Sequence, residues 1–184
     1  MTSETDRLIV ITGGPGSGKT TLIEALAGLG HATRPEAGRA IIREQQAIGG
    51  EGLPWKDRAA FAELMLAADL RSHDEARRQS GLVFFDRGLP DIAGYLALCG
   101  LPVPEPIEEA AQRFRYRSTV FIAPPWRDIF RQDAERKQDF TEAERTCEAM
   151  ARTYPRYGYD LVELPCDSVE ARIDFMLKRL GAAA

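Results

Sequence analysis

One eight-residue segment near the N-terminus constrains the fold more than any other part of the chain. It spans residues 13–20, reads GGPGSGKT, and directly follows the apolar, β-prone run at residues 8–12. Residues 20–29, which come next, carry leucine and isoleucine at helical spacing. A strand, a glycine-rich loop ending in Lys-Thr and a helix together predict a loop that binds the phosphates of a nucleoside triphosphate.

Each part of this loop has a chemical role in phosphate binding. Its glycines let backbone N–H groups close around phosphate oxygens, and the positive end of the following helix faces the same anion. Lys19 reaches the β- and γ-phosphates, and the Thr20 hydroxyl is a ligand for Mg²⁺. The alternative, a glycine-rich turn without a ligand, is disfavoured by the flanking strand and helix. We therefore expect ATP and Mg²⁺ as cofactors, with the nucleotide held by Gly13, Gly14, Pro15, Gly16, Ser17, Gly18, Lys19, Thr20 and Thr21.

Beyond this loop, short apolar runs alternate with longer stretches of helical spacing. The β-prone runs predict four further strands, at residues 31–34, 82–85, 119–123 and 161–164. The helical stretches lie at residues 38–46, 57–79, 90–98, 104–114, 126–137 and 141–157, with a last helix that ends at residue 180. Two capping patterns, Thr141 with Glu144 and Asp167 with Glu170, mark the starts of the last two helices. This alternation predicts a single α/β domain over residues 1–184, with a parallel sheet covered on both faces.

Composition limits the classes of protein that fit this chain. Its 184 residues are 44% hydrophobic and 28% charged, which suits one folded domain with a sizeable core. A net charge of −4 argues against broad electrostatic binding to nucleic acid. No apolar run is long enough to span a bilayer, and the polar start of the chain lacks a signal-peptide core, so we expect a cytoplasmic protein. Whether it forms a homodimer stays open.

Neither the cysteines nor the histidines predict a metal site. Cys99, Cys147 and Cys166 lie far apart and form no CxxC pair, which favours reduced thiols with structural roles. His31 and His73 have no ligand-type residues at metal-binding spacing, so structural or surface roles are favoured for both.

Two carboxylates follow predicted strands at the edge of the sheet where the glycine-rich loop lies. Asp86 ends the apolar run at residues 82–85 and is placed to hold Mg²⁺ through water, although it could instead only initiate a turn. Glu36 follows the second predicted strand and could take the proton from an acceptor hydroxyl. The alternative for Glu36 is a first-turn glutamate that stabilises a helix dipole.

Basic and aromatic residues complete the candidate site. Arg87, next to Asp86, could orient an acceptor or stabilise a transferring phosphoryl group, or else form a surface ion pair. Three aromatic residues could wall an acceptor pocket, namely Trp55, Phe61 and Tyr95, although core packing is the favoured role for Phe61.

A cluster of basic residues falls in the charged helix predicted after the fourth strand. It consists of Arg127, Arg131, Arg136 and Lys137. Such a cluster suits a lid, over about residues 125–140, that closes on the phosphates and excludes water. We select Arg131 and Arg136 as catalytic candidates. The alternative is a solvated helix face whose cations pair with the neighbouring acidic residues, Asp128, Asp133 and Glu135.

In combination, these motifs resemble a known group of proteins. The ordered set is GGPGSGKT, Glu36 within RPEAGR, Asp86-Arg87-Gly88 and an arginine-bearing lid. It resembles the nucleoside and nucleotide kinase branch of P-loop proteins. More narrowly, it is similar to the NadR-like ATPase/kinase family, related to ribosylnicotinamide kinase, over about residues 7–180.

The resemblance implies a three-layer α/β/α fold with a five-stranded parallel sheet in the order 2-3-1-4-5. It implies that Glu36 is the general base, that Arg87 orients substrate, and that the loop at residues 166–168, which contains Asp167, lies near adenine. The activity implied is transfer of the ATP γ-phosphate to a hydroxyl of a nucleoside, nucleotide or similar metabolite.

A non-kinase ATPase or nucleotide switch that acts on a partner protein is the alternative function. The chain contains no NKxD motif for guanine, which counts against a GTPase. Arg87 stands where motor ATPases often carry a glutamate that activates water. A kinase is expected to turn over little ATP without an acceptor, whereas a switch is expected to hydrolyse ATP slowly and to respond to a partner.

Overall fold

A parallel sheet of five strands forms the centre of the computed structural model, which describes residues 4–130 and 139–181. The strand order is β2-β3-β1-β4-β5, which confirms the predicted α/β class and the predicted topology. The strands are β1 (Leu8–Gly13), β2 (Ala32–Arg34), β3 (Val83–Asp86), β4 (Thr119–Ala123) and β5 (Asp160–Glu163).

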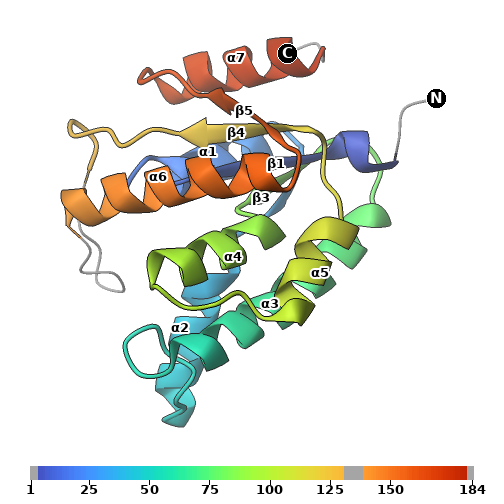
Figure 1. Ribbon diagram of the computed structural model, residues 1–184. Helices are drawn as coiled ribbons and strands as arrows, with labels where there is room; N and C mark the ends of the chain where they lie inside the picture. Colours follow the sequence, from blue (N-terminus) through green and yellow to red (C-terminus); the bar gives the residue numbers. More distant parts are fainter. Residues whose placement is uncertain (1–3, 131–138, 182–184) are drawn as a thin grey trace.

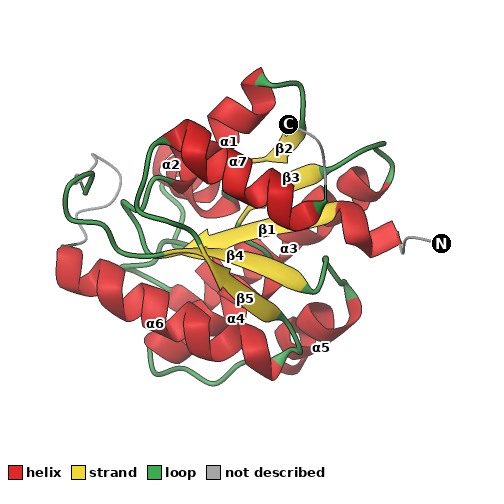
Figure 2. Cartoon of the chain, turned by 90° about the horizontal axis from the view of Figure 1, so that it is seen from above, coloured by secondary structure: helices red, strands yellow, loops and turns green. Residues whose placement is uncertain are grey.

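Helices connect the strands and cover the sheet (Figures 1 and 2). After a short 3₁₀ turn, η1 (Glu4–Arg7), the helices are α1 (Lys19–Gly28), α2 (Ala37–Ile48), α3 (Arg58–Arg77), α4 (Leu89–Leu98), α5 (Glu105–Arg113), α6 (Phe140–Arg156) and α7 (Val169–Leu180). Helices α1 and α7 lie on one face of the sheet, and α3, α4, α5 and α6 lie on the other (Figure 1).

The central strand β1 is buried along its whole length, and its side chains pack into the core on both faces of the sheet. Ile9 and Ile11 pack with the apolar residues of α1 and α7, whereas Leu8 and Val10 pack with those of α3 to α6. Alternate side chains of a strand point to opposite faces, so a strand buried on both faces needs a continuous apolar run. This requirement explains the unbroken apolar sequence of β1.

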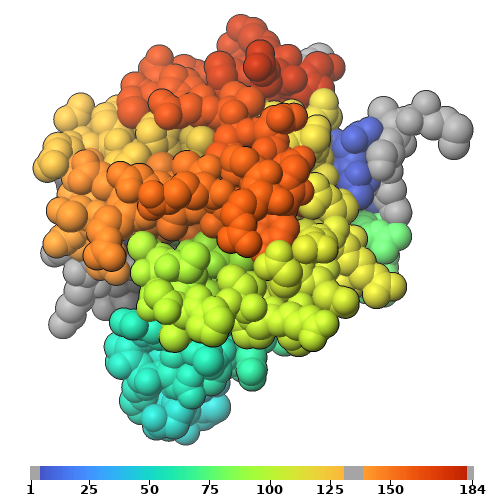
Figure 3. Space-filling model, viewed as in Figure 1, coloured from blue at the N-terminus to red at the C-terminus, as the bar shows by residue number. Residues whose placement is uncertain are grey.

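A separate small core joins α2, the loop after it and the start of α3. Its buried members are Ile41, Ile42, Leu53 and Phe61. In the space-filling view, this part of the chain projects from the body that surrounds the sheet (Figure 3). Ala37, Ile42, Trp55 and Phe61 of this projection line a cavity to which Pro15 of the glycine-rich loop also contributes.

The structure corrects both predicted capping boxes. Asp139, not Thr141, caps α6, and its carboxylate accepts a hydrogen bond from Glu142 N at 2.8 Å. Ser168, not Asp167, caps α7, and its hydroxyl accepts from Ala171 N at 3.2 Å. A capping oxygen must lie on the last non-helical residue, and several Asp, Ser and Thr residues in a row leave that position open in the sequence.

The predicted helix over residues 126–137 is only partly covered by the structure. Residues 127–129 form a turn, in which Phe130 N donates to Trp126 O at 3.1 Å, rather than a continuous helix. Residues 131–138 lie outside the described residues. Among the described helices, none combines the length and the apolar character that a membrane crossing requires. The three cysteines are free thiols.

Two glycines at the start of the loop permit close backbone packing. A Cβ on Gly13 would lie 2.3 Å from the Ala123 carbonyl oxygen of β4, and one on Gly14 would lie 2.2 Å from the Ala143 carbonyl oxygen of α6. Both distances are far below a van der Waals contact. The loop is therefore seated directly on the backbones of β4 and α6.

Substituting Gly14 by alanine should destabilise the fold, because the backbone of α6 cannot yield as a flexible side chain would. We expect Gly14→Ala to lower the free energy of unfolding by about 1–3 kcal/mol in urea denaturation. Gly28→Ala is the matched control, since Gly28 ends α1 with no atom within 4 Å of its would-be Cβ. It should be neutral or slightly stabilising. Equal stabilities of the two variants would contradict this account.

Candidate functional site

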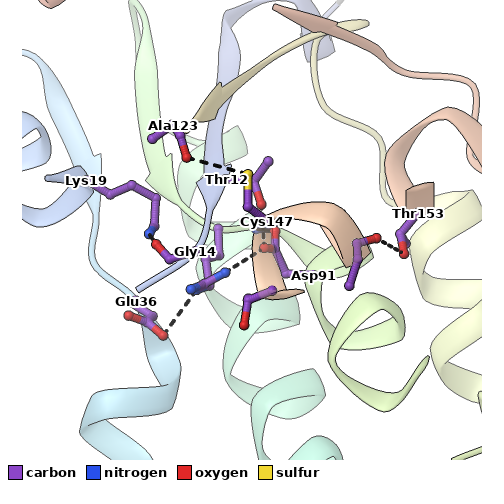
Figure 4. Close-up of polar contacts among 12 residues, drawn as sticks. Thr12, Gly14, Lys19, Glu36, Asp91, Ala123, Cys147 and Thr153 are labelled. Atoms are coloured by element: carbon purple, nitrogen blue, oxygen red, sulfur yellow. Dashed lines mark hydrogen bonds and ion pairs between the residues drawn. The ribbon is translucent and has the colours of Figure 1, made fainter. Parts of the chain in front are cut away.

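The loop between β1 and α1 curls around the ammonium group of Lys19. Lys19 Nζ donates a hydrogen bond to Gly14 O at 2.6 Å and another to Ser17 Oγ at 3.3 Å, and only 5% of the residue is exposed (Figure 4). Gly16 and Gly18 have φ angles of 70° and 81°, a left-handed conformation that glycine adopts without steric cost. The loop thus brings a buried cation and the N-terminus of α1 to one place, as a polyphosphate site requires.

Thr20 and Asp86 lie side by side at the edge of this loop. Thr20 Oγ1 donates to Asp86 Oδ2 at 3.3 Å. Asp86 Oδ1 is buried and accepts no hydrogen bond from the described residues. Burial raises the pKa of the Asp86 carboxyl above its usual value, while the nearby Lys19 ammonium opposes that rise. A hydroxyl beside a carboxylate with an unused oxygen fits Mg²⁺, which prefers oxygen ligands and keeps several of its waters.

Arg87 stands between two carboxylates at the start of α4. Its Nε donates to Glu36 Oε1 at 3.2 Å, and its Nη1 donates to Asp91 Oδ1 at 3.0 Å (Figure 4). Glu36 also pairs with Arg39, at 3.6 Å. Arg87 has a φ of 75°, and no other non-glycine residue in the described chain has a positive φ. Such a backbone costs roughly 1–3 kcal/mol and persists where the surroundings enforce it, so the position of this guanidinium is strongly determined.

Asp91 holds the Arg87 guanidinium in place through hydrogen bonds of its own to the core. It is buried and accepts hydrogen bonds from Thr12 Oγ1 at 2.6 Å, from Gly88 N at 2.9 Å and from Tyr154 OH at 2.5 Å, in addition to the one from Arg87. The sequence analysis missed Asp91. Its position two residues after Gly88-Leu89, in the first turn of a helix, is the available signal, because a carboxylate there can accept the free N–H groups of the helix start.

Asp69 of α3 is a third carboxylate near the Arg87 guanidinium, in addition to Glu36 and Asp91. It forms no hydrogen bond or ion pair with the described residues, and it lies close enough to Asp91, Glu36, Arg87 and Tyr116 to interact with them electrostatically. Burial, followed by the charges of Asp91 and Glu36, raises the pKa of Asp69 to about 7, while Arg87 opposes the rise. No sequence pattern singles out Asp69, because it lies in an ordinary helical stretch.

Two cavities meet at this cluster. The smaller, of 450 Å³, is lined by the glycine-rich loop and the start of α1, by the N-terminal end of α2, and by the β4–α6 connection, the β5–α7 connection and the first turn of α7. Its lining residues are Pro15, Gly16, Ser17, Gly18, Lys19, Thr20, Thr21, Glu36, Arg39, Trp126, Ile129, Asp167, Ser168, Val169 and Arg172. The larger, of 630 Å³, lies among α2, α3, α4 and α6. Pro15 and Glu36 line both, so Glu36 stands at the junction of the phosphate side and the second chamber.

The larger cavity has an acidic end and an aromatic wall. Glu36, Asp69 and Asp91 line it beside Arg87. It is also lined by Trp55 of the α2–α3 loop, Phe61 of α3 and Tyr95 of α4. The rings of Phe61 and Tyr95 pack edge to face at 5.6 Å. The three aromatic residues that the sequence suggested for an acceptor pocket thus line one cavity, although Phe61 is also a core residue.

Among the residues that the structure describes, most of those predicted for the site converge, whereas Gly13, Gly14 and Arg127 do not line either cavity. Glu36, Asp86, Arg87, Asp167 and residues 15–21 lie around the two cavities or at their edge. Gly13 and Gly14 line neither cavity, and their missing side chains serve backbone packing instead. Arg127 lies over the Phe140 ring at 4.0 Å and also lines neither cavity. Arg131 and Arg136 lie outside the described residues.

Comparison with known proteins identifies a family and several proteins of similar fold. A family model described as an AAA domain matches residues 8–172. A search of curated protein sequences finds no match. A solved structure of NadR protein in complex with NR superposes with a TM-score of 0.69 at 17% identity, covering 98% of this chain and 52% of that one. This chain therefore spans about half the length of that protein.

Two kinase structures are similar over almost their whole length. Deoxyadenosine kinase from M. mycoides, solved with products dCMP and dCDP, has a TM-score of 0.63 at 16% identity and covers 95% of this chain and 98% of its own. Shikimate kinase from Acinetobacter baumannii, in complex with shikimate, has a TM-score of 0.55 at 15% identity and covers 97% of this chain and 95% of its own. At these identities, the likeness establishes a shared fold.

The raised pKa of Asp69 predicts a pH-dependent effect on stability. A folded-state pKa of about 7 lies above the unfolded value, so folding favours the protonated carboxyl, and ionisation costs stability as the pH rises toward 7. Asp69→Asn removes that cost. Relative to wild type, its free energy of unfolding should rise by about 2–3 kcal/mol between pH 5 and pH 8, measured by urea denaturation at each pH.

Asp74→Asn is the control for this measurement, because Asp74 lies on the same helix but is exposed and pairs only with Arg78 in the described chain. Its difference from wild type should be nearly constant over the same range. If the difference in free energy of unfolding between Asp69→Asn and wild type is also constant from pH 5 to pH 8, the pKa of Asp69 is not raised.

Proposed function

The chain belongs to the AAA-domain family whose model it matches over residues 8–172, and we propose that it is an ATP-dependent phosphotransferase for a small-molecule hydroxyl. The observation that carries this proposal is the place of Glu36. It stands at the junction of a phosphate-binding cavity and a second, larger chamber, within hydrogen-bonding distance of Arg87. A carboxylate at that junction can reach a hydroxyl in one chamber and the terminal phosphate of a nucleotide in the other.

In this proposal the smaller cavity holds ATP. Lys19 and the N–H groups of the loop hold the phosphates, and Asp167 lies near the base. Thr20 and Asp86 would hold Mg²⁺, which neutralises charge on the β- and γ-phosphates when bound. The lid arginines of the proposal are Arg131 and Arg136.

Transfer then needs one proton movement and one displacement at phosphorus. Glu36 takes the proton from the acceptor hydroxyl as its oxygen attacks the γ-phosphorus. The bond from that phosphorus to the β,γ-bridging oxygen breaks, and ADP leaves with the electron pair. Arg87, fixed by Asp91, orients the attacking oxygen. The products are ADP, a phosphate monoester and a proton held on Glu36.

The charges in the larger cavity support an uncharged or cationic acceptor. Glu36, Asp69 and Asp91 surround a single guanidinium, and Arg87 is already paired with two of those carboxylates. The other two arginines that line this cavity in the described chain, Arg58 and Arg145, are exposed at its periphery. A phosphate or carboxylate on the acceptor would meet net negative charge near the transfer point.

The shape and lining of the same cavity support an acceptor with a polar end and a flat apolar end. Hydroxyl groups suit the acidic end, and a ring suits the wall formed by Trp55, Phe61 and Tyr95. These features favour a nucleoside over a nucleoside monophosphate. They also favour a kinase over a nucleotide switch, since a switch has no need of a second chamber joined to the phosphate site.

The decisive experiment is a screen for acceptor-stimulated release of ADP. Nucleosides, their monophosphates and other hydroxyl metabolites are added to the protein with ATP and Mg²⁺, and the phosphorylated product is identified by mass spectrometry. At least one uncharged or cationic acceptor should raise ADP release and gain one phosphate. ATP hydrolysis that no acceptor stimulates and that a partner protein alters would support the switch instead.

Removal of the Lys19 ammonium should abolish nucleotide binding. Lys19→Ala takes away the buried cation that faces the phosphates, so we expect at least a hundredfold weaker binding of ATP in isothermal titration calorimetry. Lys178→Ala is the control, because Lys178 is exposed on α7 and pairs with Asp174. Unchanged affinity in Lys19→Ala would rule out the glycine-rich loop as the nucleotide site.

Neutralising Glu36 should separate binding from transfer. Glu36→Gln keeps the shape of the side chain but removes its basicity, so ATP affinity should change less than threefold while acceptor phosphorylation falls by about 10²–10⁴-fold. Glu44→Gln, an exposed change on the same helix α2, serves as the control and should leave both unchanged. Transfer that survives Glu36→Gln would assign the base to another group.

A further inference from the structure

Arg172 is a buried cation that the proposed reaction does not use. It lies in the first turn of α7 and is 2% exposed, whereas the basic residues at the other end of the same helix, Lys178 and Arg179, are exposed. Burying a charged group is costly unless it is paired or hydrogen-bonded. Burial of this guanidinium therefore indicates a specific role, because a cation that served only as general surface charge would be exposed.

The guanidinium packs against the Ser17–Gly18 segment of the glycine-rich loop. Arg172 Nη1 donates a hydrogen bond to Ser17 O at 3.2 Å. It would also lie 2.9 Å from a Cβ on Gly18, so the absence of a side chain at residue 18 gives it room. Two segments that are 155 positions apart in sequence thus meet at one peptide group.

The same side chain has unused hydrogen-bonding capacity and no acidic partner. Its Nε is buried and has no hydrogen-bond partner in the described chain, and no carboxylate of residues 4–130 or 139–181 forms an ion pair with it. Arg172 lines the smaller cavity together with Ser17 and Gly18. An unpaired buried cation beside a cavity is suited to an anion that enters that cavity.

The hydrogen bond from Arg172 to Ser17 O determines the orientation of the Ser17–Gly18 peptide. In a trans peptide, the carbonyl oxygen of one residue and the N–H of the next point in opposite directions. A donor in α7 that holds Ser17 O therefore directs Gly18 N–H away from that donor. Gly18, with a φ of 81°, has few steric restraints of its own, so the orientation of this peptide depends on contacts such as the one with Arg172.

We propose that Arg172 is a positioning residue for the nucleotide phosphates, which fixes the Ser17–Gly18 peptide with its N–H facing the polyphosphate and adds a positive charge behind it. This inference rests on the ATP-binding part of the proposed function and is independent of the acceptor. It makes the docking of α7 a condition for phosphate binding. The helix is held by Ile173, Met176 and Leu177, which share one buried cluster with Leu22 and Leu26 of α1.

The test compares Arg172→Met, Arg172→Lys and the exposed control Arg179→Met. Two affinities are measured with the full chain: that of ADP with Mg²⁺ by calorimetry, and that of inorganic tripolyphosphate by displacement of a fluorescent ADP analogue. Thermal unfolding without ligand reports on the fold. We expect Arg172→Met to weaken both ligands by about tenfold to a hundredfold, since the Gly18 N–H is no longer held toward the charged phosphate and a hydrogen bond to a charged group contributes about that much.

Arg172→Lys should recover part of that loss, because it restores the charge but not the planar donor, and Arg179→Met should match wild type. A merely structural Arg172 would lower the unfolding temperature but leave both affinities within twofold, which overturns the proposal. Loss of ADP affinity with unchanged tripolyphosphate affinity would also overturn it, because the contact would then be with the nucleoside. A wild-type protein that binds neither ligand would refute the nucleotide site itself.

Discussion

The buried carboxylate of Asp91 connects parts of the molecule that would otherwise be independent. Through four hydrogen bonds it joins Thr12 at the end of β1, the turn after β3 and Tyr154 of α6. A buried carboxylate with all of these bonds made is stable, whereas one with a missing donor is costly. The position of Arg87, and through it that of Glu36, follows from this one group. The geometry between the two cavities is thus fixed by the core rather than by a surface loop.

Charge is distributed unequally between the two cavities. Lys19, Arg39 and Arg172 line the smaller one together with Glu36 and Asp167. The larger one is lined by Glu36, Asp69 and Asp91 around Arg87, and its other arginines, Arg58 and Arg145, are exposed. Opposite charges on the two sides of a transfer point separate an anionic ligand from a neutral or cationic one. Burial, followed by the like charges of Asp91 and Glu36, raises the pKa of Asp69, and this rise is an energetic cost of the arrangement.

The fold and the phosphate side of the site were accessible from the sequence, because they rest on local patterns. The strand before the loop, the helix after it and the carboxylate at the end of β3 could be assigned because parallel strands end at one edge of the sheet. Asp69, Asp91 and Arg172 could not be found in the same way. Their surroundings are made by α3, α4, α6 and α7 packing together. In the neighbouring sequence only Asp91 carries a signal, which is its place in the first turn of a helix. The caps of α6 and α7 were misplaced by one or two residues for a related reason, since the choice among adjacent Asp, Ser and Thr residues is decided by backbone conformation.

The left-handed backbone at Arg87 has a consequence for how such a site can change over evolution. In a regular strand, Asp86 and Arg87 would point to opposite faces of the sheet. The positive φ of Arg87 instead accompanies an arrangement in which Asp86 meets Thr20 and Arg87 meets Glu36, one peptide apart. In the proposed reaction, the groups that handle phosphate and the group that orients the acceptor therefore keep a constant spacing. Under that proposal, new acceptors can be accommodated by exchanging wall residues of α3 and the α2–α3 loop, while the geometry for transfer is retained.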